Sequence, residues 1–60
     1  MEATFELKMS AARARDLFGR WRCSIERLDA HTCNITFSDQ DEWKRFEDYC
    51  DREGIDCRLV

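Results

Sequence analysis

Proline is absent from this 60-residue sequence, which also contains only two glycines and one histidine. The glycines, Gly19 and Gly54, are too few for a glycine-rich loop of the kind that cradles phosphate groups. No apolar run approaches the ~20 residues that span a bilayer. The first residues also lack the basic-then-apolar pattern of a secretory signal, so we expect a cytoplasmic protein.

The short length limits the functions that the chain can have. We expect one domain, 1–60, and a fold of about this size buries only about 60% of the surface that its unfolded chain exposes. Little of the molecule remains to build a deep pocket, so we do not expect an enzyme. A hydrophobic content of 43% is nevertheless typical of a folded chain rather than a disordered one.

The first half of the sequence predicts a strand, a helix and a β-hairpin. Residues 2–9 alternate between polar and apolar, which is the period of a half-buried strand. Ser10 is placed to cap a helix over residues 10–21. In the hairpin that follows, a three-residue turn places Ile25 opposite Ile35. The predicted inner stripe of the helix consists of Ala11, Ala14, Leu17, Phe18 and Trp21.

The second half predicts another helix and a final strand. Ser38 or Asp39 opens the helix, and Asp41 or Glu42 follows three residues later as the return half of a capping box. Gly54 supplies the left-handed residue that ends a helix, and the last six residues then alternate as a strand. The predicted inward side chains are Trp43, Phe46, Tyr49 and Cys50 from the helix and Ile55, Cys57 and Leu59 from the strand.

The predicted order of elements is strand, helix, strand, strand, helix, strand. Joined by right-handed crossovers, these elements form a split βαβ arrangement. We therefore expect an α+β fold whose four-stranded antiparallel sheet has the order 4-1-3-2, with both helices on one face. This arrangement resembles the ferredoxin-like βαββαβ fold over the whole chain. The resemblance fixes no function, because many unrelated functions occur on this fold.

The four cysteines, Cys23, Cys33, Cys50 and Cys57, all fall at predicted inward positions. Their spacings include no Cys-x-x-Cys pair, the usual unit of a zinc site. Strands two and four would also lie ~14 Å apart, which is too far for one metal ion to bridge. Within the hairpin Cys23 and Cys33 do not face each other, so only Cys50 and Cys57 could form a disulfide. We expect buried free thiols, no metal site and no cofactor.

No catalytic residues are predicted. His31, the only histidine, falls in the hairpin turn, where a positive φ is tolerated. A cysteine–histidine nucleophile pair would require a thiol to leave the core. After the first strand the chain runs directly from Lys8 into the next helix. Acylphosphatases and heavy-metal carriers of the ferredoxin-like fold place a phosphate loop or two cysteines at that point, and this sequence has neither.

The outward face of the expected sheet offers no aromatic residues. RNA-recognition modules of the same topology stack bases on aromatic side chains of strands one and three. Arginines of the first helix could contact nucleic acid directly, but the net charge of −3 disfavours this. The outward residues are Thr4, Glu6, Lys8, Thr32, Asn34 and Thr36, and the arginines are Arg13, Arg15, Arg20 and Arg22.

Charge is divided unevenly between the two halves of the sequence. Residues 1–30 hold five acids and six bases, whereas residues 31–60 hold eight acids and four bases. Carboxylates three or four residues apart on a helix lie ~5–6 Å apart, close to the spacing of successive phosphates in a nucleic-acid strand. The second helix could therefore occupy a groove built for DNA. The predicted partner-binding residues are Asp39, Asp41, Glu42, Glu47, Asp48, Asp51 and Glu53.

Ion pairs within the second helix are the alternative explanation of these acids. Three i,i+4 pairs are expected, each worth about 0.3 kcal/mol, as on any solvated helix. They join Asp41 to Arg45, Lys44 to Asp48, and Asp48 to Arg52. The acids expected to remain unpaired are Asp39, Glu42, Glu47, Asp51, Glu53 and Asp56. This surplus would attract a basic partner.

In its length, its topology and its acidic run from Asp39 to Glu53, the chain resembles the small anti-CRISPR proteins of phages and mobile elements. Among these it resembles a ferredoxin-like inhibitor of the type I-C surveillance complex. Several inhibitors of that family are DNA mimics that block the basic site reading the protospacer-adjacent motif, and the resemblance implies the same role here. The basic first helix departs from the pattern of a pure mimic.

These features are compatible with two functions. The first is a monomeric, non-enzymatic inhibitor that binds a basic, DNA-accepting surface of a larger complex through the acidic second helix. The alternative is a small homodimerising or scaffold module, in which the basic first helix of one copy meets the acidic second helix of another. Neither function requires a cofactor, a membrane or direct contact with nucleic acid.

Overall fold

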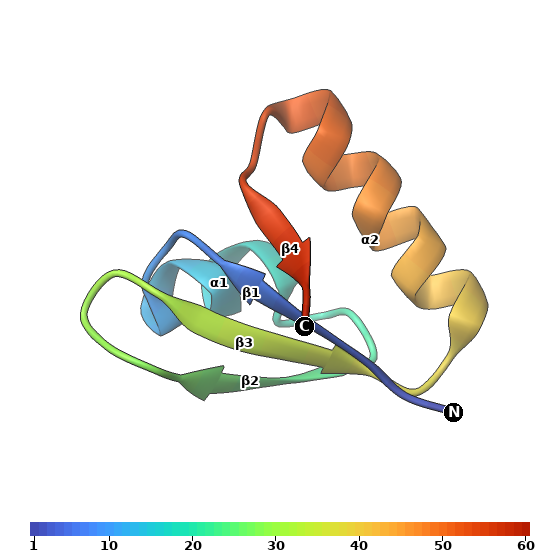
Figure 1. Cartoon of the computed structure of the whole chain (residues 1–60), viewed down its shortest axis with the longest axis horizontal. Helices are drawn as coiled ribbons and strands as arrows, with labels where there is room; N and C mark the ends of the chain where they lie inside the picture. The colour runs from blue at the N-terminus through green and yellow to red at the C-terminus, as the bar shows by residue number, and fades with distance from the viewer.

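The computed structural model describes all 60 residues as a small α+β protein with four antiparallel strands and two helices (Figure 1). The order of elements agrees with the prediction, and most elements are shorter than predicted at their ends. Neither helix combines the length and the apolar character that crossing a membrane requires. The elements are β1 (Ala3–Leu7), α1 (Ala11–Phe18), β2 (Cys23–Arg27), β3 (Cys33–Phe37), α2 (Gln40–Glu53) and β4 (Cys57–Leu59).

The strands lie in the order β2-β3-β1-β4, so β2 and β4 form the two edges of the sheet. Counted from the β4 edge, the same neighbours read 4-1-3-2, the order given in the prediction. In the hairpin Cys23 pairs with Phe37 and Ile25 with Ile35, which confirms the predicted register. The register is well specified because one face of β3 is buried and the matching face of β2 is half-buried, and a slip of one residue would turn the apolar side chains of β2 outward.

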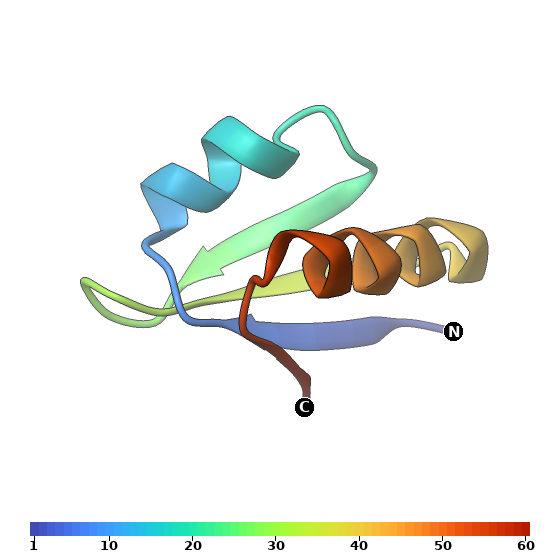
Figure 2. The ribbon, with the colours of Figure 1, turned by 90° about the horizontal axis from the view of Figure 1, so that it is seen from above.

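Both helices cover the same face of the sheet (Figure 2), because side chains from both pack into a single core with those of β1 and β3. Phe46 of α2 lies at its centre. The Phe46 ring centroid is 4.9 Å from that of Phe18 in α1, 4.9 Å from Phe37 in β3 and 5.2 Å from Phe5 in β1. The buried residues are Ala3, Phe5, Leu7, Ala11, Ala14, Phe18, Cys33, Ile35, Phe37, Phe46 and Cys50.

Helix α1 begins as predicted but ends three residues early. The Ser10 hydroxyl accepts a hydrogen bond of 3.2 Å from the Arg13 amide, which caps the helix. Trp21 lies beyond the helix end, yet its ring packs edge-on against Phe18 at 5.6 Å. The prediction that Leu17 is inward is wrong, since 37% of it is exposed. The buried residues of α1 are Ala11, Ala14 and Phe18, and Leu17 lies about 90° away from the centre of this stripe.

Helix α2 ends at Gly54, as predicted. Gly54 has φ +69°, the left-handed conformation, and its amide points back to the carbonyls of Cys50 and Asp51. The following strand β4 is less buried than expected, because 63% of Leu59 is exposed. The reason is that β4 is a short edge strand, whereas the large side chain at the centre of α2, Phe46, packs over β1 and β3.

Candidate protein-interaction surface

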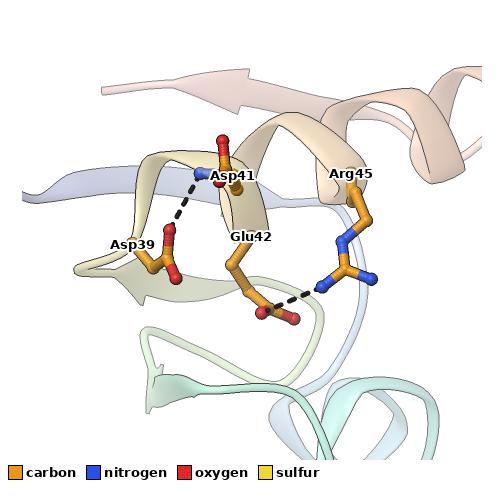
Figure 3. A network of polar contacts seen from close by, with 4 residues as sticks. All are labelled: Asp39, Asp41, Glu42 and Arg45. Atoms are coloured by element: carbon orange, nitrogen blue, oxygen red, sulfur yellow. Dashed lines mark hydrogen bonds and ion pairs between the residues drawn. The ribbon is translucent and has the colours of Figure 1, made fainter.

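The amino end of α2 brings three of the predicted binding carboxylates together (Figure 3). Asp39 is the N-cap residue, and its Oδ1 accepts a hydrogen bond of 2.9 Å from the Asp41 amide. The return half of the predicted capping box does not form, because Glu42 instead accepts a hydrogen bond of 3.4 Å from Nη2 of Arg45. Carboxylates near a helix N-terminus are stabilised by the helix dipole, so these residues support α2 as well as charging its surface.

The predicted binding residues do not form one continuous surface, because they lie on two flanks of α2. Glu47, Asp48 and Asp51 line a hollow between α2 and β4, and we call these three residues the β4-side acidic cluster. Glu42 lies on the opposite flank, where its charge adds to burial in raising the pKa of the Cys23 thiol in β2. Glu53 follows Glu42 by about three helical turns and shares its flank.

Ion pairing along α2 differs from the prediction. Arg45 pairs with Glu42 at 3.4 Å rather than with Asp41, so Glu42 is not among the unpaired acids. Both i,i+3 and i,i+4 side chains are neighbours on a helix, and here the former contact forms. Of the three predicted pairs only Asp48–Arg52 is present, at 3.5 Å. Since both of its side chains are mostly exposed, this pair contributes little to stability.

Within the β4-side acidic cluster, Glu47 and Asp51 therefore have no ion-pair partner. Lys44 is placed near them by the helical period, but it forms no ion pair with any carboxylate. All three residues of the cluster are exposed, so their charges face solvent. The flank of α2 next to β4 consequently keeps two exposed carboxylates that form no ion pair.

The other side of the molecule is basic. Arg15 of α1 lines a separate hollow with Cys23 and Ile25 of β2. No arginine of the first half of the chain takes part in a salt bridge. The basic residues predicted on the first helix and just after it are all exposed: Arg13, Arg15, Arg20 and Arg22. Arginine that forms no salt bridge thus lies beside β2, whereas unpaired carboxylates lie beside β4.

The face of the sheet that the helices leave open is polar. Nη2 of Arg58 donates a hydrogen bond of 2.6 Å to Oε1 of Glu6, which joins β4 to β1. The hydroxyls of Thr4 and Thr36 are 2.9 Å apart and join β1 to β3. Every aromatic side chain belongs to the core or packs against it, so this face has no platform on which bases could stack.

The four cysteines are free thiols in this structure. Cys33 and Cys50 are fully buried, whereas Cys23 and Cys57 are only half-buried, because both belong to edge strands. Burial, together with the charge and hydrogen bond of the neighbouring Cys57, raises the pKa of Cys50 to about 12. No three His, Cys, Asp or Glu side chains come close enough to hold a metal ion.

Thiol reactivity follows from these positions. We expect Cys33 and Cys50 to resist iodoacetamide in the folded protein at about pH 8, because burial shields them and keeps them protonated. Mass spectrometry should find all four cysteines labelled once denaturant is added. Rapid labelling of Cys50 without denaturant would contradict the burial of this thiol.

His31 lies in the β2–β3 turn and is exposed. Its backbone amide donates a hydrogen bond of 2.8 Å to Oδ1 of Asp29, and this contact lowers the pKa of the Asp29 carboxyl. The positive φ that was considered for His31 is not observed, because no residue other than glycine has one. The aspartate side chain closes the turn instead.

One part of the surface was not predicted from the sequence. A second hollow adjoins the first along β4, and its lining includes Trp43, Leu59 and Val60. Alternation assigned Leu59 to the core, and nothing in the sequence indicated that the edge of the sheet would leave it exposed.

Comparison with known proteins adds no relative. A scan against models of protein families, a search of curated proteins and a search of solved structures found no match to this chain.

Proposed function

We propose that this protein is a non-enzymatic inhibitor that binds a basic, DNA-accepting surface on a larger nucleic-acid-binding complex. In this proposal the carboxylates of α2 occupy the positions that DNA phosphates would take, and the inhibitor acts as a monomer in the cytoplasm. It needs no cofactor and makes no direct contact with nucleic acid.

The observation that carries the proposal is the unpaired charge beside β4. Glu47 and Asp51 lack ion-pair partners, and Asp48 has only an exposed one at 3.5 Å. Carboxylates that are neutralised by ion pairs attract a basic partner only weakly, whereas a surplus of exposed, unpaired carboxylates attracts one strongly. Asp39 and Asp41 extend the negative surface to the amino end of α2, although Asp39 also caps the helix.

We further propose that the α+β fold is ferredoxin-like and that the target is a CRISPR surveillance complex, with type I-C as the first to test. Length, order of elements and acidity support this class of target. Since Glu42 and Glu53 lie on the opposite flank of α2, we assign binding chiefly to the β4-side acidic cluster.

Competition with DNA tests this function. Purified type I-C surveillance complex is incubated with a fluorescent duplex carrying the protospacer-adjacent motif, and this protein is then added. We expect the duplex to be displaced, because both ligands require the same basic site. A mobility-shift assay of the protein with the duplex alone is the control, and no shift is expected there. A duplex that stays bound while the protein saturates the complex would contradict DNA mimicry.

The alternative function, a homodimerising or scaffold module, is favoured by one specific observation. The exposed arginines of α1 form no salt bridges, so a second copy could offer its acids to them. Such a dimer would be salt-sensitive, because exposed charges are screened over ~8–10 Å near physiological ionic strength. Gel filtration at low and high salt separates the two functions: the inhibitor predicts a monomer in both, whereas the alternative predicts a dimer that dissociates at high salt.

A further inference from the structure

Strand β4 leaves hydrogen-bonding groups of its backbone unpaired at the edge of the sheet. The Val60 amide donates to the Thr4 carbonyl at 2.9 Å, and the Lys8 amide donates to the Asp56 carbonyl at 3.1 Å. Residues of an antiparallel strand alternate in the direction of their backbone groups. Residues 56, 58 and 60 therefore face β1, and the amides and carbonyls of Cys57 and Leu59 face away from the sheet.

The side chains beside this edge form an apolar floor. Two hollows of about 530 and about 510 Å³ lie between α2 and β4, and they share Phe5, Glu47 and Leu59 in their linings. Leu59 and Val60 are 63% and 73% exposed, so apolar surface lies open directly beside the free backbone groups. An added strand would cover this surface and pair its backbone at the same time.

The charged side chains of the groove are all acidic. The two linings include Glu2 and the β4-side acidic cluster, and neither includes a lysine, arginine or histidine. The opposite edge of the sheet, β2, also has outward backbone groups, but Arg15 of α1 lies beside it. The groove at β4 would therefore select a basic strand.

We propose that the β4 edge is a docking site for an extended, basic segment of a partner protein, which adds to the sheet as a fifth strand antiparallel or parallel to β4. Its backbone would pair with Cys57 and Leu59. On the helix-bearing side, every second position would carry lysine or arginine, with the charged end against the β4-side acidic cluster and the aliphatic stem against Leu59. The long stems of lysine and arginine suit such a site, since they cover apolar surface while their charged ends meet carboxylates.

This inference rests on the proposed function, because it names the element of the partner that the acidic surface binds. It adds a requirement that electrostatic attraction alone does not have, namely that the β4 backbone be free to pair. Strand addition at β4 can therefore be disproved while electrostatic binding by the acidic surface still holds.

The test uses a synthetic hexapeptide of alternating lysine and valine, blocked at both ends, with a matched peptide of alternating glutamate and valine. Binding is followed by amide hydrogen exchange in NMR. With the lysine peptide we expect exchange to slow at Cys57 and Leu59 but not at Ile25, whose amide faces the β2 edge. The Arg58 amide, which faces β1, should be protected with or without peptide. The glutamate peptide should change none of them.

Substitutions at position 59 isolate the backbone contribution. Leu59→Pro removes the outward amide without touching the hydrogen bonds to β1, and proline is tolerated on an edge strand. Leu59→Ala removes the apolar side chain but keeps the amide. We expect Leu59→Pro to bind the lysine peptide about tenfold more weakly than Leu59→Ala, which corresponds to the loss of one or two hydrogen bonds. Protection of Arg58 in both variants shows that the sheet is intact.

Five results would overturn the proposal. Equal binding by the two variants, or unchanged exchange at Cys57 and Leu59, would rule out strand addition while leaving electrostatic docking possible. Lysine-peptide binding that survives Glu47→Lys with Asp51→Lys would remove the role of the acidic cluster in the proposed function as well. Protection of Ile25 instead of Leu59 would move the site to β2. A dimer that Leu59→Pro dissociates would identify a second copy of this chain as the occupant.

Discussion

Simultaneous replacement of Glu47, Asp48 and Asp51 by lysine is expected to abolish binding to the type I-C surveillance complex. Each substitution changes the charge by two units, so the net charge moves by six, from −3 to +3. The surface that attracted a basic partner would then repel it. The fold should be unaffected, because all three side chains are exposed and the one ion pair lost, Asp48–Arg52, is a weak surface pair. Biolayer interferometry measures the binding, and circular dichroism with thermal melting checks the fold.

A second triple variant separates the site from the net charge. Asp16→Lys, Glu26→Lys and Glu53→Lys make the same change in charge at exposed positions that form no ion pairs and lie outside the β4-side acidic cluster. We expect this variant to retain most of its binding. Equal loss of binding in both triple variants would mean that binding depends on total charge and not on this surface. Undiminished binding by the Glu47, Asp48 and Asp51 variant would contradict the mimicry proposal.

The largest expected effect on stability is that of Phe46→Ala. Phe46 is fully buried, and its ring lies within 5.2 Å of those of Phe5, Phe18 and Phe37. Removing a buried phenylalanine side chain costs about 3–5 kcal/mol, through lost burial and the cavity that remains. A core this small typically supplies no more than ~3–5 kcal/mol in total. We therefore expect the variant to be largely unfolded at room temperature, as measured by urea denaturation and near-ultraviolet circular dichroism.

Phe46→Leu is the matched control, because it keeps an apolar group at the centre of the core and leaves a smaller cavity. It should remain folded, with a smaller loss of stability than Phe46→Ala. If Phe46→Ala lowered the free energy of unfolding by less than about 1 kcal/mol, Phe46 could not be the side chain that joins both helices to the sheet.

Periodicity predicted the helices, the strands and the hairpin register well, but it did not predict how deeply the apolar side chains of each element are buried. Alternation identifies which side of a strand is apolar, and that sufficed to pair Ile25 with Ile35. It says nothing of what lies above an edge strand, so Leu59 was assigned to the core although it is mostly exposed. Leu17 was misplaced because it lies at the edge of the predicted stripe, about 90° from the centre of the residues that are buried, Ala11, Ala14 and Phe18.

The candidate site could be predicted as a set of acids but not as an arrangement. The sequence showed that these acids lie on one helix. Which basic side chain forms an ion pair with each acid depends on side-chain rotamers, which the sequence does not specify. Arg45 bonds to Glu42 at i,i+3 where an i,i+4 pair with Asp41 was expected. Glu47 lies on the flank of α2 that faces β4, and Glu42 lies on the flank near Cys23 of β2. Which flank faces which strand depends on how α2 packs on the sheet, and the sequence alone does not specify that packing.

If exposed carboxylates beside β4 hold this protein to a basic surface, its affinity must depend on salt concentration. Affinity for the type I-C surveillance complex is measured in sodium chloride from about 50 to about 300 mM, a range in which screening of exposed charges changes strongly. Affinity should fall steeply and continuously with salt for the wild type, and neutralisation by Glu47→Gln with Asp51→Asn should remove most of this dependence. Tight binding that is unchanged across the range would contradict this role of the carboxylates.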